Sequence, residues 1–195
     1  MMKFPFKFIS AFVLTLLLAS CGQEMTVPKP STFLRLDVKR TGYYHYNASC
    51  GYSFDVDSLF TVHDVTDEKG QMTCHKNINF GKLNGVLYFS YIDMKEPLKK
   101  YIDYALNKVD EHKVKATAIE DTSFFYPKKK VYGTFFELKG DVASPFQFYL
   151  TDSTKRFASG VVYFNAVPNY DSIRPSLDFV KVDLLKMIET FKWGE

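Results

Sequence analysis

The sequence predicts an α+β domain with a largely antiparallel sheet and two helices packed on it. Strand-like segments come first, then a helix, then more strands and a second helix, without the regular alternation that a parallel doubly wound sheet requires. Hydrophobic residues make up 46% and aromatic residues 17% of the 195-residue chain. This composition excludes disorder and is sufficient for one sizeable core.

Short strands are expected throughout the first half. The first is predicted at residues 33–38 and the second at 52–56, where apolar and polar residues alternate. The clearest hairpin joins residues 78–80 to residues 86–92 through the turn Gly81-Lys82-Leu83-Asn84-Gly85.

The hydrophobic period then changes. A helix is predicted to begin at Pro97 and to run to His112, because apolar residues fall at helical spacing on one face. Further strands are expected, with Gly140-Asp141 as one turn, at residues 114–120, 131–139, 146–151 and 160–167.

A second amphipathic helix closes the chain. Ser172 is its expected cap and Pro175 is expected in its first turn. One face carries Leu177, Val180, Leu184, Ile188 and Phe191. This order of elements resembles the Mog1/PsbP-type sandwich, a likeness that concerns the fold and not the chemistry.

The first twenty residues have the features of a lipoprotein signal peptide. Lys3 and Lys7 precede a short apolar run, which ends in Leu18-Ala19-Ser20 before Cys21. A membrane-spanning helix would need about 20 apolar residues. We therefore predict cleavage after Ser20 and lipidation of Cys21, with a spanning anchor or an ordinary secretory signal as the alternatives.

Three regions follow from this cleavage site. Residues 1–20 are the signal peptide, residues 21–31 are the lipidated cysteine and a proline-stiffened tether, and residues 32–195 are a single α+β domain. Each methylene group of an acyl chain such as palmitate stabilises membrane attachment by roughly 0.8 kcal/mol when it is buried in the lipid. The acyl chains alone therefore attach the protein to a membrane. The domain is expected in the periplasm, and Gly22 after the cysteine favours the outer membrane.

Charge argues against nucleic acid as a partner. The net charge of +3 falls to +1 when Lys3 and Lys7 leave with the signal peptide. A domain that is close to neutral has no electrostatic footprint for nucleic acid.

Cys50 and Cys74 are the two cysteines that remain besides Cys21. In an oxidising compartment they indicate one disulfide, which would stabilise the fold by roughly 3 kcal/mol. Two free buried thiols are the main alternative. A zinc site that includes His75 is another, less compatible with the compartment.

No catalytic, metal or cofactor motif occurs in the sequence. HExxH, CxxC, EF-hand, P-loop, GxGxxG and GxSxG patterns are all missing. We therefore predict no catalytic residue, no metal site and no cofactor.

Distinctive residues follow one another through the second half of the chain. They are Val131-Tyr132-Gly133, Gly140, Ala143-Ser144-Pro145, Gln147-Phe148, Thr151-Asp152-Ser153, Tyr163-Phe164-Asn165, Pro168-Asn169, Glu189-Thr190-Phe191 and Trp193. In these residues and their order the chain resembles the gliding-motility lipoprotein GldD family of the Bacteroidota. Weaker similarity reaches back to Pro28-Lys29-Pro30 and to the cysteine pair. The chain departs from the family pattern at Ser31-Thr32-Phe33, where Arg-Gly-Tyr is expected, and at His75, where an aromatic residue is expected.

The resemblance implies a non-enzymatic envelope lipoprotein of the gliding apparatus, which is functionally tied to type IX secretion. Its partners would be other gliding-motility or secretion proteins of the envelope. The expected interaction surface consists of Ala143, Ser144, Pro145, Gln147, Thr151, Asp152 and Ser153.

Two other functions remain open from the sequence. An envelope hydrolase would need a deep pocket with two converging carboxylates or a Ser/His pair, lined by His63 or His75. A carrier of a small apolar ligand would need a cavity of roughly 300 Å³ or more between helix and sheet.

Overall fold

The computed structural model describes residues 37–165 and 169–194. The chain divides into two units, residues 1–31 and 32–195, and every described residue belongs to the second. The expected signal peptide, Cys21 and the tether therefore lie outside the described residues. Of the strand expected at residues 33–38, only Asp37 and Val38 are described, and neither is in a strand.

The described residues form two antiparallel sheets. The smaller sheet has the order β1-β2-β10, with β1 at Tyr43–Ala48, β2 at Tyr52–Asp57 and β10 at Lys192–Trp193. The larger sheet has seven strands in the order β3-β4-β5-β9-β8-β7-β6. Its strands, in chain order, are β3 (Thr61–Thr66), β4 (Met72–Asn79), β5 (Gly85–Asp93), β6 (Ala116–Tyr126), β7 (Val131–Gly140), β8 (Phe146–Thr151) and β9 (Arg156–Phe164).

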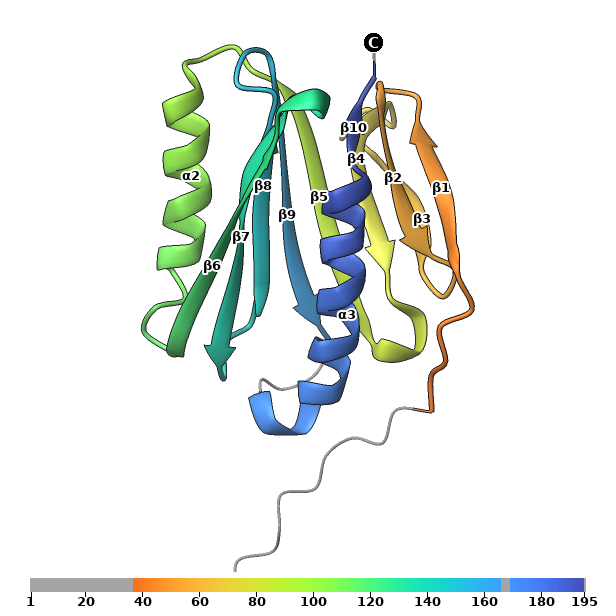
Figure 1. Cartoon of the computed structure of the whole chain (residues 1–195), viewed down its shortest axis with the longest axis vertical. Helices are drawn as coiled ribbons and strands as arrows, with labels where there is room; N and C mark the ends of the chain where they lie inside the picture. Colours follow the sequence, from red (N-terminus) through yellow and green to blue (C-terminus); the bar gives the residue numbers. More distant parts are fainter. Residues whose placement is uncertain (1–36, 166–168, 195) are drawn as a thin grey trace, which may run out of the picture. The chain divides into compact units, whose positions relative to one another are not determined.

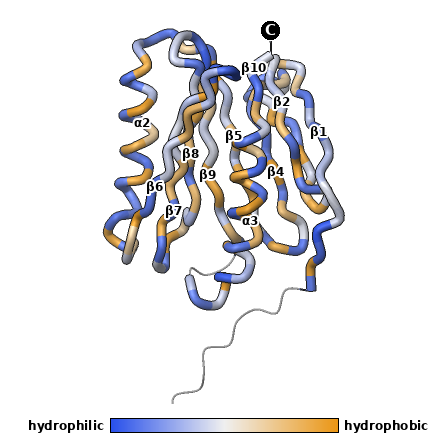
Figure 2. Tube along the Cα trace, viewed as in Figure 1, coloured by the Kyte–Doolittle hydropathy of each residue, from blue (hydrophilic) through white to orange (hydrophobic). Residues whose placement is uncertain are grey.

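Two α-helices pack on opposite faces of the large sheet. The helix α3 (Tyr170–Thr190) lies beside the small sheet, and its apolar residues join strands of both sheets in the main core. On the outer face, α2 (Leu98–Asp110) buries Val109 against Phe136, Leu138 and Val142 in a second, smaller core. Figure 2 shows apolar and polar residues alternating along both helices, as the helical period requires. The predicted α+β class with a largely antiparallel sheet is confirmed.

The two cores differ greatly in size. The main core contains a run of stacked and tilted rings, and Tyr52, Phe54, Phe89 and Phe191 are four of its members. By contrast, Val109 is the one buried residue of α2. The outer face of the large sheet is therefore covered only in part, and this uncovered area contains the candidate site.

The expected start of β9 at Gly160 is wrong, because the strand begins at Arg156. The pair Ser159-Gly160 is typical of a strand boundary, yet Gly160 lies in the middle of the strand. A Cβ atom at this position would lie 2.2 Å from Cε1 of Phe148. The glycine is needed because the Phe148 ring of β8 occupies the space of a side chain.

The cap of the last helix also differs from the expected one. The N-cap is Asn169, whose side-chain oxygen accepts a hydrogen bond from the backbone N–H of Ser172 at 3.1 Å. Ser172 is therefore inside the first turn, and Pro175 lies within the helix beyond that turn. Asparagine and serine are similarly good caps, so the sequence pattern alone placed the helix start too late.

Candidate functional site

A disulfide joins the two sheets. Cys50 lies in the turn between β1 and β2, and Cys74 lies on β4 of the large sheet. Their sulfur atoms are bonded, with the two Cα atoms 5.7 Å apart. The predicted disulfide is confirmed, and neither cysteine has a free thiol to bind zinc.

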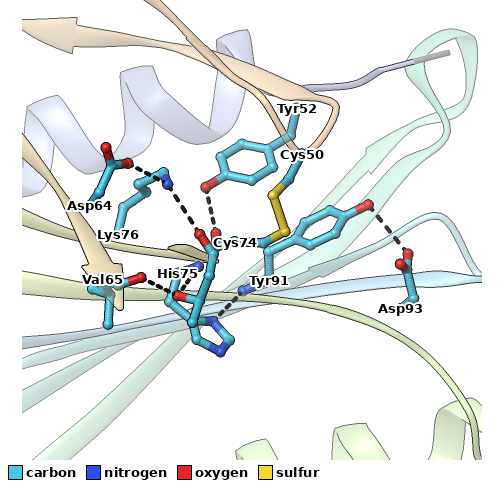
Figure 3. Close-up of a disulfide and its surroundings, with 10 residues drawn as sticks. Cys50, Tyr52, Asp64, Val65, Cys74, His75, Lys76, Tyr91 and Asp93 are labelled. Atoms are coloured by element: carbon cyan, nitrogen blue, oxygen red, sulfur yellow. Dashed lines mark hydrogen bonds and ion pairs between the residues drawn. A yellow bond between two sulfur atoms is a disulfide. The ribbon is translucent and has the colours of Figure 1, made fainter. Parts of the chain in front are cut away.

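Polar contacts surround this bridge (Figure 3). The hydroxyl of Tyr52 donates a hydrogen bond to the carbonyl of Cys74 at 2.7 Å. The backbone N–H of Tyr91 donates to Nδ1 of His75 at 3.2 Å. The buried ammonium of Lys76 is 2.6 Å from Oδ1 of Asp64. These contacts fix the β4–β5 region around the bridge and give His75 a structural role.

Reduction of the disulfide is expected to lower the free energy of unfolding by roughly 3 kcal/mol, because the bridge closes a loop whose ends are 24 residues apart. For a domain of this size that corresponds to a fall in Tm of roughly 6–12 °C. Thermal denaturation with and without dithiothreitol measures the difference. A Cys50→Ser/Cys74→Ser variant should show the lower Tm already and should not respond to the reductant.

The expected interaction surface is not a single surface. Ser144, Pro145, Gln147 and Thr151 are buried, Asp152 is half-buried, and only Ala143 and Ser153 are exposed. This prediction needs correction because its residues support the β7–β8 and β8–β9 connections from within. Most of these residues lie on or beside β8, a strand that is almost wholly buried.

The Thr151-Asp152-Ser153 segment is a turn motif. Oδ1 of Asp152 accepts hydrogen bonds from the backbone N–H groups of Thr154, Lys155 and Arg156 at 2.8–2.9 Å. Burial acts to raise the pKa of Asp152, but these amides outweigh burial and hold the pKa below its ordinary value. The carboxylate stays ionised and closes the β8–β9 turn.

A groove lies between α2 and the outer face of the large sheet. Its volume is about 300 Å³, and residues of α2, β5, β8 and β9 line it. The tyrosines Tyr88, Tyr104 and Tyr163 stand around it, and Ser159 and Gln147 contribute to its floor. Of the residues expected in the interaction surface, only Gln147 lines this groove.

The groove carries balanced charge. Nζ of Lys108 lies 2.8 Å from Oε1 of Glu111, so the two charges of its wall pair with each other. Burial lowers the pKa of His112 below its ordinary value, so the imidazole is neutral at pH 7. The charged residues of the lining therefore add up to no net charge.

A second hollow, of about 550 Å³, lies between α3 and strands β6 and β7. Phe124 and Leu185 are among its apolar lining residues. Lys181 pairs with Glu137 across the hollow, which ties α3 to the sheet. These contacts give the hollow a structural explanation.

Two buried carboxylates, Asp57 and Asp183, share one cation. Nε of Arg40 is 2.9 Å from Oδ1 of Asp183 and 3.5 Å from Oδ2 of Asp57. The hydroxyl of Tyr43 also donates to Asp183, at 2.8 Å. Burial raises the pKa of Asp183, while Arg40 and Tyr43 oppose the rise. No local pattern predicts this cluster, because Asp183 is 143 residues away in the chain from Arg40, which it contacts.

The histidines considered for an enzyme lie elsewhere. His63 is on the edge strand β3, where Nε2 is 3.1 Å from the hydroxyl of Thr61, and neither His63 nor His75 lines the groove. Within residues 37–165 and 169–194, no three histidine, cysteine or acidic side chains gather as metal ligands. Over the same ranges, no helix has the length and apolarity needed to cross a membrane.

The chain matches the model of one protein family, described as gliding motility lipoprotein GldD, over residues 23–193. This range includes every described helix and strand. Comparison with curated proteins gives no match.

Proposed function

The chain belongs to the gliding motility lipoprotein GldD family, and from that premise we propose that it is a non-enzymatic component of gliding machinery linked to type IX secretion. The observation that carries the proposal is the family match, which spans residues 23–193. Cell movement and the secretion that supports it would then depend on this chain as a binding component of the envelope.

The proposed position is on the periplasmic side of a membrane, with the outer membrane favoured. Cys21 carries the acyl chains, including palmitate, and residues 21–31 separate the domain from the lipid surface. The lipoprotein character of the family and the small residues before Cys21 support this attachment.

A non-enzymatic role agrees with how the titratable groups are used. Asp57 and Asp183, two carboxylates placed close together, are buried and contact Arg40 in place of a substrate. Asp152 closes a turn, and Glu111 pairs with Lys108. Each of these acidic groups therefore has a structural partner, which favours a binding role over hydrolysis.

The partners are proposed to be other envelope proteins of the same machinery. The outer face of the sheet offers exposed aromatic contacts besides the groove. Phe125 on β6 is exposed, and its ring lies 5.1 Å from that of Tyr132 on β7. Exposed aromatic side chains of this kind are common at protein–protein interfaces.

Crosslinking of native membranes, followed by purification of the intact lipoprotein and mass spectrometry, tests this proposal. Recovery of gliding or secretion proteins is the expected result. Because Phe125 is exposed, Phe125→Ala should fold normally while it weakens contacts made through the outer face. Recovery of no envelope protein in repeated experiments would contradict the proposal.

A further inference from the structure

Three tyrosines around the α2 groove leave much of their side chains exposed. Tyr88 and Tyr163 project from the adjacent strands β5 and β9, with exposed fractions of 47% and 38%. Their rings meet edge to face, 5.8 Å apart. Tyr104 on α2 is 64% exposed. Aromatic rings at the rim of a hollow are typical of a ligand site, because they offer large apolar faces without large losses of conformational entropy.

The floor of the groove holds hydrogen-bonding groups that the fold leaves free. Gln147 is only 4% exposed, and its single side-chain contact is Nε2 to the carbonyl of Lys108 at 3.5 Å, the limit of a hydrogen bond. Within the described part of the chain, its Oε1 accepts no hydrogen bond. Ser90 and Ser159, directly opposite each other on β5 and β9, also line the groove.

Oε1 of Gln147 keeps access to water from the open groove, because among the described residues it is not one of the fully buried side-chain atoms without a partner. A buried polar group that loses its hydrogen bond to water needs another in its place. A ligand that fills the groove and displaces this water must therefore supply a hydrogen-bond donor to Oε1 of Gln147.

The charges of the groove select the class of ligand. Lys108 pairs with Glu111 and His112 is neutral, so the lining carries no net charge that would favour an anion or a cation. The amide and hydroxyl groups of the floor would remain unsatisfied against an acyl chain. What fits is a neutral molecule that has both apolar faces and many hydroxyl groups.

We propose that this groove binds one ring of a neutral carbohydrate, as part of a glycan that continues into solvent. The apolar C–H face of the sugar would stack on Tyr88 and Tyr163, and its hydroxyl groups would bond to Gln147, Ser90 and Ser159. A volume of about 300 Å³ is at the small end of ligand pockets, which suits a single ring. This binding activity is separate from the role proposed above and is tested on the isolated protein.

The test uses the full lipidated chain in detergent micelles and three soluble probes: chitotetraose, cellotetraose and maltotetraose. Saturation-transfer NMR detects binding, and titration of the signal gives Kd. At least one probe is expected to bind. Its saturation-transfer signal should come mainly from a single sugar ring, either terminal or internal.

Three variants locate the site. Tyr88→Ala should weaken binding about tenfold, because a stacking ring is lost, while Tyr88→Phe should bind nearly as well as the wild type. Gln147→Leu should bind more weakly still if its thermal unfolding shows a native fold. Tyr44→Ala is the matched control, since Tyr44 is 39% exposed on the small sheet and should not affect Kd.

Two results would overturn the proposal. The first is that none of the three oligosaccharides binds at millimolar concentration. The second is that binding occurs but is equally strong in Tyr88→Ala and Tyr44→Ala, which would place the sugar elsewhere. If no probe binds while Tyr88→Ala abolishes crosslinking to a protein, the groove is a protein-docking site and the carbohydrate proposal is wrong.

Discussion

An Arg40→Met variant is expected to lose about 3 kcal/mol of its free energy of unfolding at pH 7. Arg40 is the cation that contacts both Asp57 and Asp183, and both carboxylates are buried. Removing one partner of a buried ion pair leaves the other charge unpaired, which typically costs 3–5 kcal/mol. The expected loss lies at the lower end of this range, because the side chain of Arg40 is one-third exposed. Methionine keeps an apolar stem over the ring of Phe179.

The loss should depend on pH. The pKa of Asp183 is raised by burial already in the wild type, and Arg40 opposes that rise. Without Arg40 the pKa of Asp183 in the folded state rises further. A carboxyl group with a raised folded pKa is destabilising when ionised, and the penalty disappears as the pH falls through that pKa. The difference between variant and wild type should therefore be smaller at pH 5 than at pH 7.

Urea denaturation at both pH values measures these differences. Arg174→Met is the matched control, because Arg174 on α3 is exposed and its loss should change the free energy of unfolding by less than about 0.5 kcal/mol. Adding Asp183→Asn to Arg40→Met should recover part of the loss, since it removes the unpaired charge. Equal stability of Arg40→Met and Arg174→Met would show that the buried carboxylates do not need Arg40.

A Cys21→Ala variant is expected to remain an uncleaved precursor without a lipid. Acylation of the thiol precedes cleavage in the proposed pathway, so removal of the sulfur blocks both steps. Labelling of cells with a palmitate analogue should give no signal for this variant, and its mass should include residues 1–20.

The control for this experiment is Cys50→Ser/Cys74→Ser. This variant lacks the disulfide but keeps the proposed acylation site, so it should be labelled and cleaved like the wild type. Normal cleavage and membrane attachment of Cys21→Ala would contradict the assignment of Cys21 as the lipidated residue.

Local patterns predicted much of this fold. The β4–β5 hairpin was correctly predicted, because a glycine-containing turn between apolar runs has few other conformations. The helix α2 was placed within two residues at each end, since its apolar spacing follows the helical period. The Cys50–Cys74 bridge followed from the number of cysteines and from the predicted compartment.

Other elements depend on tertiary contacts that local patterns do not contain. The strand β1 carries Tyr43, Tyr44 and His45 in sequence, so it lacks a clear alternation, and it is defined by its pairing with β2. The short strand β10 exists because Lys192 and Trp193 pair with β2 after the last helix turns back. A pairing between residues so distant in sequence has no local signal.

The candidate groove was missed for a similar reason. Tyr88 and Tyr163 are separated in sequence but become neighbours because β5 and β9 pair directly. The alternation Tyr88-Phe89-Ser90 already indicated that Tyr88 and Ser90 share one face of a strand. What it could not indicate was that α2 covers only part of that face and leaves these side chains around a hollow.

Cells in which the gene for this chain is cleanly deleted test its proposed role in motility through their movement over a surface. We expect gliding over a surface and export of type IX substrates to be lost in these cells. A plasmid copy of the wild-type chain should restore both, whereas Cys21→Ala should not. If the deleted cells glide and secrete as the parent strain does, the proposed role in motility is wrong.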